Sequence, residues 1–311
     1  MLFRSRDVSP APVQLIWSRE EDTTHDFYRP AAVAKMKGGL DANGAPLAWV
    51  TKSVSDAIVP QYVRRTYPTF AVDTPDKTTV EGLFDQPYEF PHRHCAHVTH
   101  HTPVPIGFWR SVGHSHNAFF CECFIDEMAF AARRDPLDFR RRLLARHVRH
   151  RRVLELAAAK AQWGRVGPGR AHGIALHESF GSIVAQVAEV SLAQGGEIRV
   201  QRVVCALDCG TAVNPEIVAQ QVESGIVFGL TAALYGEITI NAGRVEQRNF
   251  PQYRMLTLAD TPRIETHLVP SDAPPGGVGE VATPPIAPAV ANALFRLTGR
   301  RLRSLPLRLA A

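Results

Sequence analysis

One acidic residue stands apart in a stretch that otherwise holds glycines, prolines and small side chains. The stretch "PPGGVGEVATPP" spans residues 274–285, and Glu280 is its only ionisable side chain. Strand-like residues 263–272 precede it and helix-like residues 284–299 follow, so Glu280 lies on a loop of the kind that often carries catalytic groups. A carboxylate among such neighbours is poorly hydrated, which disfavours its charged form and suits a general base. Alternatively, it points outward from an exposed loop, and this segment leaves both interpretations open.

A second candidate for chemistry is the segment "GFWRSVGHSHNAFF", residues 107–120. Arg110 could bind an anion through its guanidinium, Gly113 would let the backbone approach closely, and the start of the next helix would offer free N–H groups. In the alternative interpretation Arg110 makes a surface ion pair and Gly113 forms an ordinary turn. Spacing alone favours this second interpretation.

A histidine-rich run is the third candidate, because imidazole and thiolate groups bind zinc and copper. The run "PHRHCAHVTHH" contains His92, His94, Cys95, His97, His100 and His101. On a strand, the side chains at 92, 94 and 100 would share one face. The spacing matches no standard structural zinc pattern, and the same alternation could leave these side chains in solvent.

The elements that must position these residues are a mixture of helices and strands. Strands are predicted at residues 45–54, 183–192 and 197–208, and the last two form an antiparallel hairpin through "AQGG". Helices are predicted at residues 119–132, after the N-cap Asp135, and after the N-cap Asn214. In the last of these, Gly225 and Gly229 share one side and would allow another backbone to approach closely. The predicted fold class is therefore α+β, a mixed α/β fold.

Two regions are expected, divided by a linker. Residues 165–172, "RVGPGRAH", interrupt two well-patterned stretches, which places the boundary between residues 1–164 and 165–311. The N-terminal residues 12–17 resemble a strand that begins in the middle of a structural unit.

Composition excludes several classes of protein. Of 311 residues 45% are hydrophobic, which allows a large core. The basic run 139–152 alternates with apolar residues and predicts a helix with one solvated face rather than a nucleic-acid-binding arm. Five scattered cysteines indicate reduced thiols. Neither a signal peptide nor an uninterrupted apolar stretch of about 20 residues is visible, so no membrane span and a cytoplasmic location are expected for the chain as written.

Several long motifs together resemble a known family. They are "LIWSREEDTTHDFYRP" and four further segments, at residues 103–129, 173–192, 203–250 and 273–295. In collinear order over about residues 12–305, the chain is similar to the molybdopterin-binding large subunit of the xanthine dehydrogenase/aldehyde oxidase family. Of the family's branches, the isoquinoline 1-oxidoreductase β-subunits are the most similar.

The resemblance implies roles for particular residues. Glu280 matches the glutamate of the family's G-x-G-E motif, the base that takes a proton from the water-derived oxygen at molybdenum before this oxygen attacks an N-heteroaromatic or aldehyde carbon. Arg110, Ser111, Val112 and Gly113, with the motif glycines Gly277 and Gly279, are expected to bind the cofactor; no residue is expected to be a metal ligand. The turns 177–182 and 208–215 match further family loops near the cofactor domain.

The resemblance also implies partners and a missing part. The cofactor is expected to be molybdenum-molybdopterin, of the cytosine dinucleotide type, while iron–sulfur clusters belong to a small [2Fe-2S] partner subunit. The family's large subunit is more than twice this length, and its "GGGFG" and "GQG" loops are absent here. The chain is therefore expected to be the C-terminal half, to need a chain carrying the N-terminal half, and to derive from a parent subunit that could be periplasmic. Alternatively it is a non-catalytic remnant without cofactor, or a histidine-cluster metal-binding protein.

A local difference concerns the base itself. Glu280 is followed by Val281 and Ala282, where related sequences commonly carry proline or glycine. The loop is therefore expected to sit slightly differently from its counterparts.

Overall fold

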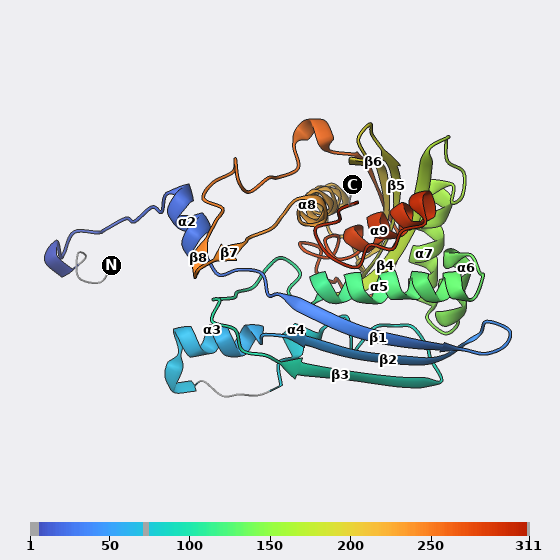
Figure 1. Cartoon of the computed structure of the whole chain (residues 1–311), viewed down its shortest axis with the longest axis horizontal. Coiled ribbons are helices and arrows are strands. Elements are labelled where there is room, and N and C mark those ends of the chain that lie inside the picture. Colours follow the sequence, from blue (N-terminus) through green and yellow to red (C-terminus); the bar gives the residue numbers. More distant parts are fainter. Residues whose placement is uncertain (1–5, 71–74, 310–311) are drawn as a thin grey trace. The chain divides into compact units, whose positions relative to one another are not determined.

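A computed structural model describes residues 6–70 and 75–309 of the chain (Figure 1). The chain divides into two compact units. The smaller comprises Met1–Asp26 and Glu237–Arg254, and the larger comprises Phe27–Gly236 and Met255–Ala311.

The smaller unit contains one short helix and one short hairpin. Helix α2 (Arg19–His25) begins at Ser18, whose hydroxyl accepts a hydrogen bond from the Glu21 amide. Strands β7 (Ile240–Asn241) and β8 (Arg244–Val245) pair antiparallel. The predicted strand at residues 12–17 is wrong: these residues pair with no strand in the described part of the chain, and Ile16 is 79% exposed.

The larger unit begins with a three-stranded sheet. Strand β1 (Ala32–Leu40) pairs antiparallel with β2 (Pro46–Ser55), which pairs in parallel with β3 (His92–Thr99). The parallel pairing requires a crossover, which contains α3 (Ile58–Thr66), the 3₁₀ turn η1 (Pro68–Phe70) and α4 (Lys77–Val80). The predicted strand at residues 45–54 is confirmed as β2.

A four-stranded sheet forms the centre of the larger unit. Its order is β4 (Arg170–Ser179), β5 (Ser182–Leu192), β6 (Ile198–Asp208) and β9 (Arg263–Leu268). The predicted antiparallel hairpin of β5 and β6 is confirmed, while β9 pairs with β6 in parallel. Of the predicted linker 165–172, residues 165–169 form a loop, but residues 170–172 belong to β4 because they pair with β5.

The helices follow the predicted caps closely. Asp135 caps α6 (Pro136–Leu143), and Asn214 caps α8 (Pro215–Leu234); each side chain accepts two backbone N–H bonds in the first turn. Helix α9 (Ile286–Thr298) is present where the sequence predicts it. Helix α5 (His114–Ala131) begins five residues earlier than the predicted 119, directly after Gly113. The 3₁₀ turn η2 (Leu258–Asp260) precedes β9.

The basic run at residues 139–152 differs from its prediction as a single helix. It is divided between α6 and α7 (Val148–Ala161), and the chain turns between them at Leu144–His147. Arg140 does not lie on a solvated face, because its side chain is fully buried and paired with Glu122 of α5. Arg142 and Arg146 do face solvent.

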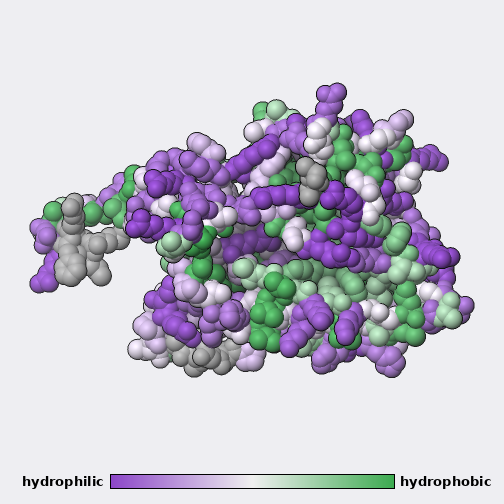
Figure 2. Space-filling view, viewed as in Figure 1, coloured by the Kyte–Doolittle hydropathy of each residue, from purple (hydrophilic) through white to green (hydrophobic). Residues whose placement is uncertain are grey.

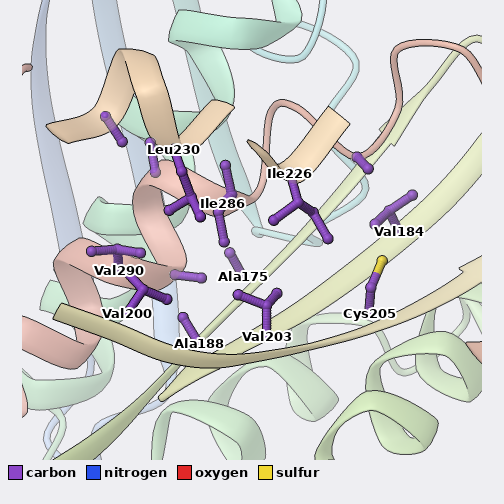
Figure 3. Close-up of a cluster of buried hydrophobic side chains, with 14 of the residues drawn as sticks. Ala175, Val184, Ala188, Val200, Val203, Cys205, Ile226, Leu230, Ile286 and Val290 are labelled. Atoms are coloured by element: carbon purple, nitrogen blue, oxygen red, sulfur yellow. The ribbon is translucent and has the colours of Figure 1, made fainter. Parts of the chain in front are cut away.

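The core lies on both faces of the four-stranded sheet. Along β5, Val184 and Ala188 pack on the face covered by α8 and α9, whereas Ile183 and Val187 pack on the face covered by α5, α6 and α7. Figure 3 shows the first of these layers, where side chains of the sheet meet Ile226, Ile286 and their neighbours from the helices. A strand buried on both faces explains the nearly continuous apolar sequence of β5.

Some apolar surface remains exposed on the larger unit. Figure 2 shows hydrophobic residues at the surface over β1 and α5, where Val33 is 70% exposed. Helix α8 is long and apolar enough to cross a membrane by length and composition alone, but half of its apolar window is buried inside the protein. The five cysteines are free thiols.

Candidate functional site

Glu280 lies in the loop between β9 and α9, where its side chain is half-buried. The Ser111 amide donates to Glu280 Oε1 at 2.8 Å, and the Ser111 hydroxyl donates to the backbone oxygen of Glu280 at 2.7 Å. Across the described parts of the chain, no hydrogen bond reaches the second carboxylate oxygen, Oε2. The carboxylate is therefore fixed through one oxygen while the other is available.

Arg110 fixes the residue that precedes this carboxylate. Its Nε donates to the backbone oxygen of Gly279 at 2.9 Å, and its Nη2 donates to the same oxygen. Nη1 donates to the Ser224 hydroxyl at 3.0 Å, and Nη2 also reaches Gln221 Oε1 at 3.4 Å. Burial lowers the pKa of Arg110, and the nearby Glu280 charge acts in the opposite direction. The guanidinium thus binds the loop that carries the acid.

The turn at residues 110–113 has an unusual backbone. Ser111 and Val112 have φ angles of 75° and 45°, in the left-handed region that a β-branched residue rarely adopts. Gly113 is needed for space, because a Cβ there would lie 2.2 Å from the Thr78 carbonyl oxygen. The amides of residues 111–113 donate to Glu280, Trp109 and Thr78, respectively.

A second set of contacts holds the glycine-rich part of the same loop. The Gly277 amide donates to the Phe180 carbonyl at 2.8 Å, and Ser182 Oγ donates to the Gly277 carbonyl at 2.6 Å. The Gly276 amide donates to the Cys209 carbonyl at 2.8 Å. The turns 177–182 and 208–215 therefore both contact the loop that ends in Glu280.

Helix α8 packs closely against residues 282–286, which follow Glu280, at its two glycines. A Cβ at Gly225 would lie 3.1 Å from the Ala282 Cβ, and one at Gly229 would lie 2.5 Å from Ile286 Cγ2. Thr283 Oγ1 donates to the Gly225 carbonyl at 3.2 Å. The predicted close approach of another backbone along this side of the helix is confirmed.

Two buried histidines near the site have no role in the sequence prediction. His114 Nδ1 and His177 Nε2 are 2.9 Å apart and share a hydrogen bond. Burial lowers the pKa of His114 to about 4, and lowers that of His177 well below the usual range. Both residues lie within segments noted in the sequence, but 63 positions apart, and nothing local pairs them.

The histidine-rich run lies elsewhere, on β3. His92 and His94 are exposed, while His97 shares a hydrogen bond with the Ser53 hydroxyl at 2.8 Å and His101 contacts Asp56. Among the described residues, no three His, Cys, Asp or Glu side chains are grouped so that they could hold a metal ion. The structure thus gives no support to a metal centre here.

A cavity of about 700 Å³ lies between β1, α5 and residues 303–305. Its lining includes His116, which is 7% exposed and whose Nδ1 has no hydrogen-bond partner among the described residues. Phe119 and Phe120 form part of its wall. Neither Glu280 nor Arg110 lines this cavity, so its size does not identify the site of chemistry.

Comparison with known proteins places this geometry in a family. Two family models match in tandem, at residues 4–144 and 143–262, and each describes a molybdopterin cofactor-binding domain. The chain is also 32% identical over 118 residues to the xanthine dehydrogenase molybdenum-binding subunit of Escherichia coli O157:H7, covering 36% of this chain and 16% of that one. The chain belongs to the molybdenum-binding subunits of the xanthine dehydrogenase family. Its predicted fold class is thereby confirmed.

Two further relatives match nearly the whole of this chain. It is 31% identical over 305 residues to the beta subunit of isoquinoline 1-oxidoreductase from Brevundimonas diminuta, covering 95% of this chain and 38% of that one. It is 30% identical over 328 residues to a subunit of nicotinate dehydrogenase from Pseudomonas putida, covering 95% and 27%. The chain therefore spans less than half the length of these relatives.

Solved structures support the fold of this chain. Quinoline 2-oxidoreductase from Pseudomonas putida 86 superimposes with a TM-score of 0.77 at 13% identity, over 94% of this chain and 62% of that chain. Glu280 lies beyond residue 262, outside both family matches, so its role must be argued from its surroundings.

Proposed function

We propose that this chain provides the base and part of the cofactor wall of a molybdenum hydroxylase. The reaction adds a water-derived oxygen to a carbon of an N-heteroaromatic ring or an aldehyde. The observation that carries the proposal is the Glu280 carboxylate, which Ser111 holds through one oxygen while the other oxygen is left for a proton. A base must be fixed in place and yet keep a free lone pair.

The residues beside Glu280 fit an anionic cofactor rich in hydrogen-bond acceptors. A Cβ added to Gly279 would meet only Gln221 Oε1, at 3.8 Å, so the loop has an open face there. The Arg110 guanidinium and the exposed Ser224 hydroxyl lie next to this face and offer charge and donors. We propose that residues 110–113 and the glycines 277 and 279 would hold the molybdopterin.

The chain's own residues would move and orient the proton. When bound, the cofactor would supply the water-derived oxygen and would take up the hydrogen of the substrate C–H bond together with its two electrons, as a hydride equivalent. Glu280 would accept, on Oε2, the proton of the water-derived oxygen. The hydrogen bond from the Ser111 amide to Oε1 would keep the carboxylate from rotating away. Arg110 holds the Gly279 carbonyl, so the base is positioned before substrate arrives.

The remaining parts of the enzyme would come from partners. The chain spans 38% of the beta subunit of isoquinoline 1-oxidoreductase, and the names of several relatives describe subunits, which supports an assembly of several chains. We propose that the rest of the molybdenum subunit completes the site. A small [2Fe-2S] subunit would remove the electrons, and the cofactor would be of the cytosine dinucleotide type.

The test is co-expression of this chain with a polypeptide carrying the remainder of the subunit, followed by molybdenum analysis and a hydroxylation assay. Molybdenum is expected in the co-purified complex. Glu280→Gln should retain the metal and lose hydroxylation, because the amide cannot take up the proton. Glu223→Gln, at an exposed position on α8, is the matched control and should behave as wild type.

Two results would count against the proposal. Full turnover by Glu280→Gln would remove this residue from the mechanism. Absence of molybdenum from every co-purified sample would favour a non-catalytic remnant instead.

A further inference from the structure

The loop that carries Glu280 is held at two places by two separate turns. The turn at residues 110–113 binds its C-terminal end, through hydrogen bonds to Gly279 and Glu280. The hairpin turn at residues 177–182 binds its glycine-rich part, through the two hydrogen bonds to Gly277. The position of the carboxylate therefore depends on the distance between the two turns.

The hydrogen bond between His114 and His177 joins the segments that carry these two turns. His114 is the first residue of α5, and His177 lies near the end of β4, as the first residue of the hairpin turn at residues 177–182. Nδ1 of His114 and Nε2 of His177 are 2.9 Å apart, and the two residues are 5% and 4% exposed. The Phe180 carbonyl accepts the hydrogen bond from the Gly277 amide, and the Phe180 ring packs edge-on against the His114 ring, with the ring centroids 5.2 Å apart.

The surroundings fit this pair tightly. A Cβ at Gly82 would lie 2.6 Å from His177 Cε1 and 3.0 Å from His114 Nδ1, so only glycine leaves room for both rings. On its far side, His114 Nε2 lies 3.7 Å from Glu81 Oε2. One ring must donate and the other accept, and both rings remain neutral at ordinary pH because burial disfavours the cation.

We propose that His114 and His177 form a brace that positions the Glu280 loop. They are positioning residues, since they contact the turns and not the reacting atoms. The inference rests on the proposed function for its consequence in catalysis, but the brace itself can be tested without it. Loss of the hydrogen bond should let the two turns separate and loosen the contacts that each makes to the loop.

Hydrogen exchange of single amides in the full chain tests the brace. The probes are the Ser111 amide, which binds Glu280, and the Gly277 amide, which binds Phe180. In His177→Leu both should exchange about tenfold faster, because a local opening becomes easier. His177→Gln should restore slow exchange, since its amide can reproduce the Nε2 hydrogen bond. His114→Leu is an independent way to break the brace and should give the same result as His177→Leu.

His172→Leu is the matched control. His172 is also buried, lies on the same strand β4 and stacks on Trp163, but it contacts neither turn. The His172→Leu substitution should lower the free energy of unfolding. It should not speed hydrogen exchange at the two probe amides relative to other amides of the sheet. Equal acceleration in His172→Leu, or unchanged exchange in both His177→Leu and His114→Leu, would overturn the brace.

Activity measurements separate this inference from the proposed function. In the co-purified complex, His177→Leu should lower kcat more than it raises KM, with unchanged molybdenum content, and His177→Gln should recover most of kcat. Turnover by Glu280→Gln would refute the proposed function and leave the exchange result standing. Slow exchange in the leucine variants would refute the brace whatever the activity.

Discussion

Replacing Arg140 with methionine should destabilise the protein strongly, although this arginine belongs to a run that resembles a surface helix. Its Nε donates to Glu122 Oε2 at 2.9 Å, and its Nη2 donates to the Glu122 carbonyl at 2.9 Å. Glu122 is 1% exposed and also accepts from Tyr88 and from the Leu176 amide. Without Arg140 its charge would be buried and uncompensated, which typically costs about 3–5 kcal/mol.

The pKa of Glu122 also reflects the energetic cost of burying its charge. Burial raises the pKa of Glu122, and the positive charge of Arg140 acts against that rise. In Arg140→Met the carboxyl group should take up a proton more readily. The loss of stability should therefore be smaller at acid pH than at neutral pH, because protonation relieves the buried charge.

Urea unfolding of four variants tests this reasoning. Arg141→Met, one residue along α6, removes an arginine that is 39% exposed and pairs with Asp138, so it should cost under about 1 kcal/mol. Glu122→Gln combined with Arg140→Met should be at least about 2 kcal/mol more stable than the sum of the single changes, because no charge is left buried. A cost for Arg140→Met no larger than for Arg141→Met, or simple additivity, would refute the argument.

Two further predictions concern the elements around the site. Gly229→Val should lower the melting temperature and loosen the Glu280 loop, because even a Cβ would lie 2.5 Å from Ile286 Cγ2; an unchanged melting temperature would contradict this packing. Burial opposes ionisation of Asp208, but hydrogen bonds from Arg149 and the Gly210 amide outweigh it and hold its pKa below the usual value. Asp208 thus stabilises the fold above its unfolded pKa of about 4 and loses this effect as pH falls through the folded pKa. Melting temperatures from pH 7 to pH 3 should fall less for Asp208→Asn than for wild type, and parallel curves would show that this carboxylate contributes nothing.

The sequence predicts those elements whose signals are local. Asp135 and Asn214 predict helix starts, because an N-cap side chain and the proline after it stabilise the first turn of the same helix. The hairpin of β5 and β6 is predictable because alternating or continuous apolar runs flank two glycines. The glycines of α8 are predictable as a contact side, since helical periodicity places Gly225 and Gly229 together.

Contacts between distant segments are beyond such reasoning. The basic run appears continuous because neither glycine nor proline marks the turn at Leu144–His147, and Arg140 is buried only because α5 brings Glu122 to it. The strand-like residues 12–17 lack a partner strand in the described part of the chain, which no local pattern reveals.

The candidate site shows the same division. Glu280 and Arg110 are recognisable as unusual residues, but they are 170 positions apart. The sequence suggests that Arg110 binds an external anion, but it does not reveal that the guanidinium also donates to the Gly279 carbonyl. His114 and His177 carry no local signal as a pair, because the hydrogen-bond partner of each ring lies 63 positions away in the sequence.

The contacts to the acid-bearing loop have an order along the chain. The residues of this chain that contact the loop all precede residue 274: Arg110, the hairpin turn 177–182, Cys209 and the glycines of α8. The ribosome therefore synthesises these contact residues before it synthesises the loop. Glu280 is thus the last group to join its own site during synthesis. A stop codon late in the gene would remove the carboxylate together with α9, whose side chains form part of the core on one face of the central sheet.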